Sequence, residues 1–522
     1  MKHKSVMGTP FSQVPRADIP RSSFRRNHGC KTTFDEGFLV PIFVDEVLPG
    51  DTMHMKMSVF ARLATPLTPF MDNMVLRSYW FFVPNRLVWT NWQKFMGQQD
   101  SPGDSTDYLI PQITAPLGGA PENTLADYFG IPTNIDGLTF NALPARGYQL
   151  IRNEWFRDQN LQTPTVISKG DGPDTTTSMV IQRVAKRHDQ FTSCLPWPQK
   201  GPSTTIPFAS TNAPVTRVSN AANWKAFQGG TNTVPANNPM TVAAGATTST
   251  AVGISLDPDG GLIVASTAMG TINQLRQAFQ VQKLYERDAR GGTRYTEIIY
   301  SHFGVTSPDS RLQRPEYLGG GISPININPV AQTAPTTGGS TPQGNLAAFG
   351  TVSASAHGFT KSFDEHGYIF GLVAVTADIN YQEGLERHWS YRTRLDYAWP
   401  ALSHLGEVPV YNREIYAQGT AGGAADAAAF GYNEKDYQYR YKPSIITGLF
   451  RSQATGSLDI WHLAPDFSAL PVLNSSFIVE DAPVDRVIAT PSEPHFLFDS
   501  HFDYTCARPL PTNAVPGFVD HF

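Results

Sequence analysis

Charged side chains are scarce in this 522-residue chain. Asp, Glu, Lys and Arg together make up 16% of it, against roughly 25% in ordinary soluble domains. Aromatic residues reach 11%, and the formal net charge is only −5. Contact surfaces between protein subunits are depleted of charge and enriched in aromatic residues. The composition therefore predicts a protein that covers much of its surface with other subunits.

Cysteine is rare as well, and its three copies lie far apart in the sequence. Cys30, Cys194 and Cys506 form no Cys-x-x-Cys pair, which excludes a disulfide framework and fits a reducing compartment. The basic start MKHKSVMGTPFSQVPR has no apolar signal-peptide core. The longest apolar run, about 368–377, has the length of a buried strand and is far short of the roughly 20 residues that span a bilayer. We expect a soluble protein that is made in the cytoplasm.

Catalytic signatures are also missing. The chain has no nucleophile elbow, no His-Glu-x-x-His pair, no P-loop and no dinucleotide fingerprint. His501 and Asp503 have the spacing of an iron site and alternate onto one strand face, but only His521 follows them as a nearby third ligand, so chance explains the pair better. Asp364, Glu365 and His366 are typical of a solvated hairpin tip. We expect no enzyme, no catalytic residue, no metal ion and no cofactor.

Apolar runs bounded by turn residues predict a mainly β protein. Met53, Met55 and Met57 alternate with polar residues, which is the period-2 pattern of a half-buried strand. A short helix should follow the third strand, with Asn85 as its cap and Gly97 as its end. The expected strands cover residues 37–51, 53–59, 74–84, 368–381, 444–450, 475–489 and 495–506.

The clearest helix is expected between Thr271, which forms a capping box with Gln274, and Gly291-Gly292. Its apolar half contains Leu275, Ala278, Phe279, Val281, Tyr285 and Ala289. A basic stripe runs beside that half, made of Arg276, Lys283, Arg287 and Arg290. The stripe is either a solvated edge or a surface that faces phosphates or another subunit.

Residues 1–31 differ in charge from the rest of the chain. Their basic residues are Lys2, Lys4, Arg16, Arg21, Arg25, Arg26 and Lys31, against the single acid Asp18. We expect an extended arm that has no core of its own and contacts a polyanion such as DNA, with Phe11 and Phe24 available to stack on bases. The alternatives are a solvated tail and a tie between subunits.

Residues 203–267 are rich in Thr, Ala, Asn, Gly and Pro and show no period. A segment of this length is either a functional excursion or a disordered insertion without a role. A second weakly patterned segment runs from about residue 319 to 350. We divide the chain into the arm (1–31), two folded parts (32–202 and 268–522) and the 203–267 insertion.

Five long motifs occur in one order along the chain. They are FDEGFLVPIFVDEVLPGDT, FFVPNRLVWTNWQKFMG, LPWPQKG, INQLRQAFQVQKLYERDARGGTRYTEIIYSHFGV and RPEYLGGGISPIN. Together they closely resemble the major capsid proteins of microviruses, which are small single-stranded DNA bacteriophages, and the gokushovirus branch looks nearest.

The resemblance implies an eight-stranded antiparallel viral jelly roll with long helical and loop insertions. It further implies a T=1 icosahedral shell around a circular single-stranded DNA genome, in a virion assembled in the host bacterial cytoplasm. Implied partners are other copies of the chain, a small basic DNA-packaging protein, a pilot protein, an internal scaffolding protein and a host cell-surface receptor. The 203–267 insertion occupies the place of the family's threefold projection. Two other classes stay open. A glycan-binding or glycan-cleaving β protein would share the aromatic residues and loops, and a β-barrel iron oxygenase would rest on His501 and Asp503 alone.

Overall fold

A computed structural model describes residues 20–202, 272–292, 295–304, 313–334 and 343–513. The larger of its two main sheets contains β1 (Ser22–Arg25), β2 (His28–Phe34), β4 (Thr52–Leu63), β9 (Asn326–Ala331), β10 (Leu346–Ser362) and β14 (Phe496–Arg508). The smaller sheet contains β3 (Val40–Val47), β5 (Met74–Pro84), β8 (Glu316–Pro324) and β11 (Gly367–Ala377). The chain is mainly β, as the sequence predicts.

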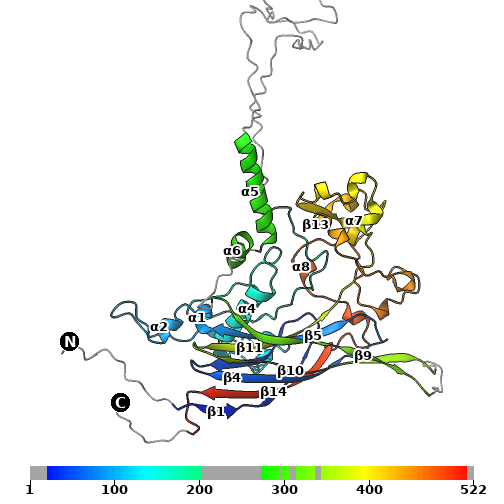
Figure 1. Cartoon of the computed structure of the whole chain (residues 1–522). Coiled ribbons are helices and arrows are strands. Elements are labelled where there is room, and N and C mark those ends of the chain that lie inside the picture. The colour runs from blue at the N-terminus through cyan, green and yellow to red at the C-terminus, as the bar shows by residue number, and fades with distance from the viewer. Residues whose placement is uncertain (1–19, 203–271, 293–294, 305–312, 335–342, 514–522) are drawn as a thin grey trace, which may run out of the picture. The chain divides into compact units, whose positions relative to one another are not determined.

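Every pairing within the two main sheets is antiparallel (Figure 1). The larger sheet has the order β1-β14-β4-β10-β9, and β2 also pairs with β14. The smaller sheet has the order β3-β11-β5-β8. The chain passes between the two sheets several times, and β14, the last of their strands in the sequence, lies between β4 and the first two strands.

The alternation predicted for the second strand is confirmed in β4. Met53, Met55 and Met57 are buried, while the polar residues between them are exposed. A strand with this pattern covers a core with one face and leaves the other face open. β14 repeats the pattern over its first nine residues, so the outward-facing side chains of both central strands are exposed.

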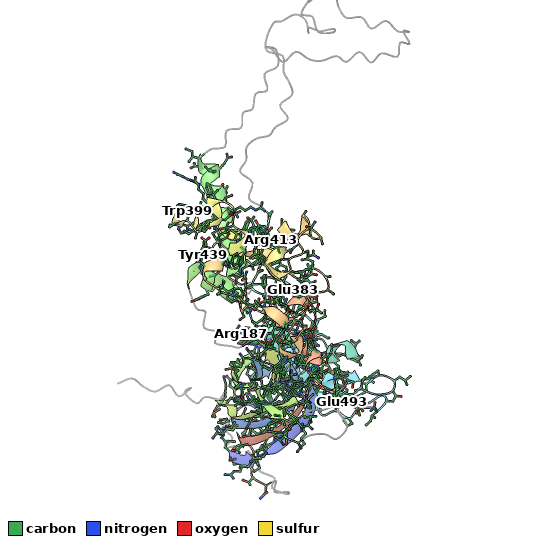
Figure 2. The ribbon with its side chains drawn as sticks, turned by 90° about the vertical axis from the view of Figure 1, so that its right-hand side faces the viewer. Arg187, Glu383, Trp399, Arg413, Tyr439 and Glu493 are labelled. Carbon is green, nitrogen blue, oxygen red and sulfur yellow. The ribbon has the colours of Figure 1, made fainter. Side chains whose placement is uncertain are left out.

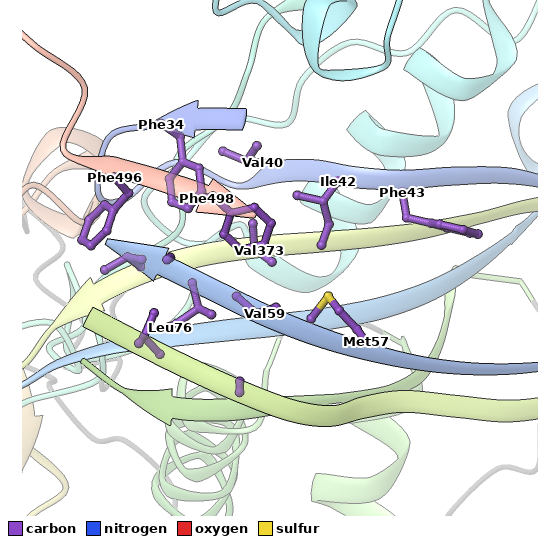
Figure 3. Packing of buried hydrophobic residues seen from close by; sticks show 14 of the residues in the cluster. Phe34, Val40, Ile42, Phe43, Met57, Val59, Leu76, Val373, Phe496 and Phe498 are labelled. Carbon is purple, nitrogen blue, oxygen red and sulfur yellow. The ribbon is translucent and has the colours of Figure 1, made fainter. Parts of the chain in front are cut away.

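The two sheets are joined by a cluster of aromatic rings. The ring centroids of Phe43 on β3 and Trp80 on β5 lie 5.4 Å apart, and Phe43 lies 5.4 Å from Phe502 on β14. Trp80 meets Phe502 edge-on at 6.1 Å. Towards one end of the core, Phe34, Phe496 and Phe498 pack together between the same two sheets (Figure 3).

Helices cover the other face of the smaller sheet. They include α1 (Asn85–Val88), α2 (Trp92–Phe95), α3 (Leu125–Tyr128) and α4 (Leu143–Ile151), beside a small β6–β7 ladder (Gln112–Thr114 with Thr139–Asn141). Phe370 and Leu372 of β11 pack into this second core. Gly147 makes the approach of α4 possible, because a Cβ there would lie 2.7 Å from the Phe370 ring. β11 is therefore buried on both faces, as its apolar run predicts.

A third core supports the segment between β11 and β14. It lies around β12 (Glu407–Tyr411), β13 (Ala429–Glu434), α7 (Asn412–Ile415) and α8 (Ser475–Ile478). Its centre holds the buried carboxylate of Glu414, to which Tyr437 donates a hydrogen bond. Arg387 donates to the same carboxylate at 3.3 Å and to the Pro409 carbonyl at 2.7 Å. The hydrogen bonds of Arg387 and Tyr437 to Glu414 therefore hold parts of this segment together around its own small core.

Several sequence predictions are wrong in detail. Residues 22–31 are not a free arm, because β1 and β2 add them to the larger sheet. Residues 444–450 and 475–489 form short helical turns, and the Asn474 side chain accepts from two backbone N–H groups to begin α8. Asn85 is a buried first residue of α1 and makes no side-chain cap. The weakly patterned segment from residue 319 contains most of β8 and all of β9.

The long helix predicted to end at Gly291-Gly292 is confirmed. The long helix exists as α5 (Ile272–Arg290), and α6 (Tyr295–Phe303) follows it. Thr271, the first residue of the expected capping box, lies outside the described residues, as do residues 1–19 and the 203–267 insertion. The described residues 199–202 and 272–292 belong to one unit and the rest of the described residues to another.

Replacing Phe502 by Ala should lower the free energy of unfolding by about 3–5 kcal/mol, because the change opens a cavity where both sheets meet. Phe60→Ala on the adjacent strand β4 is the matched control, since that ring points outward with 56% of its surface exposed, and its effect should stay within about 0.5 kcal/mol. Urea unfolding of the full-length protein measures both. If both variants lost the same free energy of unfolding, the assignment of Phe502 to the core would be contradicted.

Candidate assembly and nucleic-acid surfaces

The sequence candidates for metal chemistry do not come together into a site. His501 and Asp503 lie on the exposed face of β14, as their alternation predicts. Among the described residues, no three His, Cys, Asp or Glu side chains are grouped so that they could hold a metal ion. Glu365 forms an ion pair with Arg86 at 2.6 Å and so supports the turn before β11. No helix within the described ranges has the length and apolarity to cross a membrane.

A cavity of about 410 Å³ is lined by the acids Asp35, Glu36, Asp481, Asp485 and Glu493, with Arg183 and His495 among them (Figure 2 labels Glu493). Burial lowers the pKa of His495, but hydrogen bonds to Glu36 and Asp485 outweigh burial and raise it overall. Each of these two carboxylates lies against the His495 ring, at 3.4 and 2.9 Å. The contacts give the histidine a structural role between β2 and β14.

Glu480 is fully buried behind this cavity and does not line it. Its carboxylate accepts a hydrogen bond from the Ala377 N–H at 2.9 Å. Burial, with the nearby charge of Glu36 as a smaller cause, raises the pKa of Glu480 from 4.5 to about 7. A glycosidase needs two carboxylates that both face the sugar, and Glu480 has no access to a sugar.

Two basic residues of the expected arm are used inside the fold. Arg26 donates two hydrogen bonds to the Asp45 carboxylate, and its guanidinium lies 5.4 Å from the centre of the Tyr504 ring. Arg21 donates to the Gly50 carbonyl and to the Thr52 hydroxyl. These contacts attach β1 to the rest of the protein, so Arg21 and Arg26 stabilise the fold whatever else they contact.

Two other arm residues point away from the core. Arg25 lies opposite Thr505 on the outer face of the larger sheet, and Lys31 lies opposite Asp499 on the same face. Phe24 faces the other way, beside buried Cys506, and is half-buried. The expectation that Phe24 stacks on bases is therefore not supported by its position. Lys2, Lys4, Phe11 and Arg16 lie outside the described residues.

The basic stripe of α5 is exposed along its whole length in the single chain. Its members are Arg276, Lys283, Arg287 and Arg290. The apolar half is also largely uncovered, since Phe279 is 63% exposed and Ala289 is the only buried residue of the helix. An amphipathic helix is normally stabilised by packing of its apolar face. Within residues 199–202 and 272–292, the described part of its unit, little packs against the apolar face of α5.

Seven large aromatic and leucine residues are exposed on the segment between β11 and β14, and the sequence analysis missed them. We call this group the insertion patch; its members are Trp389, Leu395, Tyr397, Trp399, Leu405, Tyr439 and Tyr441. Trp399 and Tyr439 lie close together (Figure 2), and the Tyr439 hydroxyl accepts from the Ala398 N–H at 3.3 Å. These residues follow neither a helical nor a strand period. Only their unusual density of aromatic rings could have indicated a surface.

Charge around the insertion patch is balanced. Residues 386–442 contain seven basic and seven acidic side chains. Several are already paired, including Lys442 with Glu386 at 2.6 Å and Lys435 with Asp436 at 2.6 Å. Exposed apolar patches of this kind mark contacts with other macromolecules, and neutral charge with many aromatic rings is typical of contacts between proteins.

Comparison with known proteins gives one consistent result. The family model described as capsid protein (F protein) matches residues 12–518. The chain is 49% identical to capsid protein VP1 of Bdellovibrio phage phiMH2K over 98% of both chains. It is 43% identical to capsid protein VP1 of Chlamydia phage 1, covering 99% of this chain and 98% of the other. Identity to capsid protein VP1 of Spiroplasma virus 4 is 35%, over 97% of each chain.

Glu480→Gln should remove a pH dependence of stability. Because the folded-state pKa of about 7 lies above the ordinary 4.5, the folded protein binds an extra proton between these values, and the free energy of unfolding falls as pH rises through that interval. Glutamine keeps an oxygen for the Ala377 N–H and carries no charge, so the variant should be about 3 kcal/mol more stable than wild type at pH 8.

Urea unfolding of the full-length protein at pH 5 and pH 8 measures this difference. Glu493→Gln is the control, because it neutralises an exposed carboxylate at the same cavity and should leave the pH slope unchanged. If the free energy of unfolding changes equally with pH in Glu480→Gln and in wild type, Glu480 does not bind the extra proton in the folded state. That result would contradict the raised pKa.

Proposed function

The chain belongs to the capsid protein (F protein) family, and from that premise we propose that it assembles into a T=1 icosahedral shell around a circular single-stranded DNA genome. It is a capsid protein of the microvirus type, and its place is the virion. Full-length matches to three capsid proteins carry this conclusion. The same matches give no support to a glycan-binding, glycan-cleaving or iron-dependent protein.

The fold of each subunit is proposed to be an eight-stranded jelly roll. Taken in chain order, β2, β3, β4, β5, β8, β10, β11 and β14 give the sheets 1-8-3-6 and 2-7-4-5. That order is what two interlocking Greek keys produce. β1 and β9 extend the first sheet at its edges. The helical layer, the insertion segments and α5 then occupy connections between jelly-roll strands.

Contacts between copies of the chain are proposed to use the insertion patch. A shell closes only if each subunit has surfaces that fit other surfaces of identical subunits. Trp and Tyr side chains are the residues that most often dominate such contacts. The balanced charge of residues 386–442 supports a protein as the occupant, because a nucleic acid would require an excess of cations.

The genome and several accessory proteins are the proposed partners inside the particle. Lys2, Lys4, Arg16 and Arg25 are proposed to contact DNA phosphates, which requires no base sequence. The small basic DNA-packaging protein, the pilot protein and the internal scaffolding protein are proposed from the family alone. Assembly is proposed to take place in the host bacterial cytoplasm.

Residues 203–267 are proposed to form the outermost projection and to attach the particle to a host cell-surface receptor. Support comes from α5, which follows this insertion and has an uncovered apolar face. Three copies of α5 that meet at a threefold axis would cover Phe279 and Leu275 against one another. The basic stripe would then border that contact. Three neighbouring attachment sites would also strengthen a weak receptor contact.

Trp389→Asp should block particle formation without unfolding the subunit. Trp389 is 72% exposed, so the folded monomer tolerates the change, whereas a carboxylate buried between copies is destabilising at every repeated contact. Particle yield should fall more than roughly tenfold. Sedimentation and cryo-electron microscopy of the purified material measure yield and symmetry.

Val166→Asp is the matched control, because Val166 is an exposed apolar residue (88%) outside the insertion patch. Normal particles from Trp389→Asp would show that the insertion patch is not a subunit contact. Wild-type particles without icosahedral symmetry would overturn the proposed function itself.

Replacing residues 203–267 by a short Gly-Ser linker should leave particles that assemble but no longer adsorb to host cells. The physical reason is that the linker removes the proposed receptor-binding surface and leaves both jelly-roll sheets unchanged. Adsorption of labelled particles to cells measures the effect. Normal adsorption would refute the attachment role, and a loss of assembly would assign the segment to cohesion at the threefold axis.

A further inference from the structure

The outer face of the larger sheet is an open surface with an exposed aromatic ring near its middle. Phe60 on β4 lies between Asp499 on β14 and Ser353 on β10, and 56% of the Phe60 residue is exposed. Most neighbouring positions on this face are polar, such as Ser58 and His54. Leu497, two residues from Asp499 on β14, is an exposed apolar neighbour of Phe60 on this face. A Phe that is more than half exposed contributes little to the core of its own chain.

A hollow of about 630 Å³ lies beside the Phe60 ring. Its lining includes Phe60, Arg62, Lys31, Leu497, Asp499 and Asp127. Arg62 is two residues from Phe60 on the same face and lies opposite Leu497, while Lys31 lies opposite Asp499. Pockets of this size hold small organic ligands, and a nucleotide is of that size.

Positive charge exceeds negative charge on this face. The exposed cations are Arg25, Lys31, Lys56 and Arg62, and the exposed carboxylates that face them are Asp499 and Asp503. Lys31 lies 3.6 Å from Asp499. Arg25, Lys56 and Arg62 have no carboxylate within 4.0 Å among the described residues, although Asp503 is the cross-strand neighbour of Lys56. Three cations are therefore available to an external anion.

The basic N-terminal residues join this same sheet. β1 begins at Ser22 on its edge, directly after a segment that contains Lys2, Lys4 and Arg16. Two cations of this face, Arg25 and Lys31, therefore follow the basic residues of 1–19 closely in the sequence. The insertion patch has a different chemistry, with balanced charge and several large aromatic residues. The two surfaces consequently suit different classes of partner.

We propose that the outer face of the larger sheet binds single-stranded DNA, with one base stacked on Phe60 and the adjacent phosphates at Arg62 and Lys56. An exposed aromatic ring on an open sheet, surrounded by cations, is how many proteins hold single strands without reading sequence. The inference rests on the proposed function, since it names where on the subunit the enclosed genome is held.

Two substitutions at Phe60 separate stacking from simple apolar contact. Phe60→Leu keeps an apolar side chain but removes the aromatic ring, and Phe60→Tyr keeps the ring. Fluorescence anisotropy of a labelled 20-nucleotide oligothymidylate with full-length protein should show binding about tenfold weaker for Phe60→Leu and close to wild type for Phe60→Tyr. Arg62→Gln should weaken binding and reduce its dependence on salt concentration.

Cross-linking tests the same surface in intact particles. With 5-bromodeoxyuridine in the genome, ultraviolet light should link DNA to the β4 peptide in wild type and Phe60→Tyr, and the link should be lost in Phe60→Leu. Cross-links confined to residues 1–19, or equal oligothymidylate binding by all variants, would overturn the proposal while leaving DNA packaging intact. A lower yield of DNA-free shells from Phe60→Leu would also overturn the proposal, because it would show that this face contacts another copy of the chain and not DNA. Wild-type particles that contain no DNA would instead overturn the proposed function.

Discussion

The contact of Phe43, Trp80 and Phe502 between the two sheets is the constraint on which the rest of the subunit depends. These rings come from three strands that are distant in sequence, and their packing decides which face of each strand is buried. Because β14 must present Phe502 inward, its alternate residues point outward beside β4. The open face that carries Phe60 is thus fixed by the same core that holds the sheets together.

Two outer surfaces of this subunit meet different needs of a capsid. The insertion patch is aromatic and electrically balanced, which suits contact with another protein surface. The outer face of the larger sheet is largely polar and carries more exposed cations than exposed carboxylates, which suits a flexible polyanion. A low total charge does not conflict with the proposed nucleic-acid binding, because four exposed cations lie on one face of the sheet and further ones lie in residues 1–19.

Much of the framework could be predicted from the sequence, and the reasons are local. The alternation in residues 53–59 and the apolar run near residue 370 identify strands with one and two buried faces. The chain's own pattern could not show that residues 22–31 join the sheet, since their partner is β14, almost 500 residues away. Residues 475–489 were mistaken for a strand because an Asn cap outweighs β propensity there. Phe60 and the insertion patch became visible only with the three-dimensional pairing.

The position of β14 links the completion of this surface to protein synthesis. β14 lies between β4 and the N-terminal strands, yet more than 400 residues separate Leu63 from Phe496 in the chain. At ribosomal speeds this interval lasts about 20–90 s. During that time the edges of β4 and β2 that β14 later occupies have no partner, and the face around Phe60 is incomplete. A nascent or truncated polypeptide therefore cannot engage the genome through this face, and only chains translated through β14 compete for places in the shell.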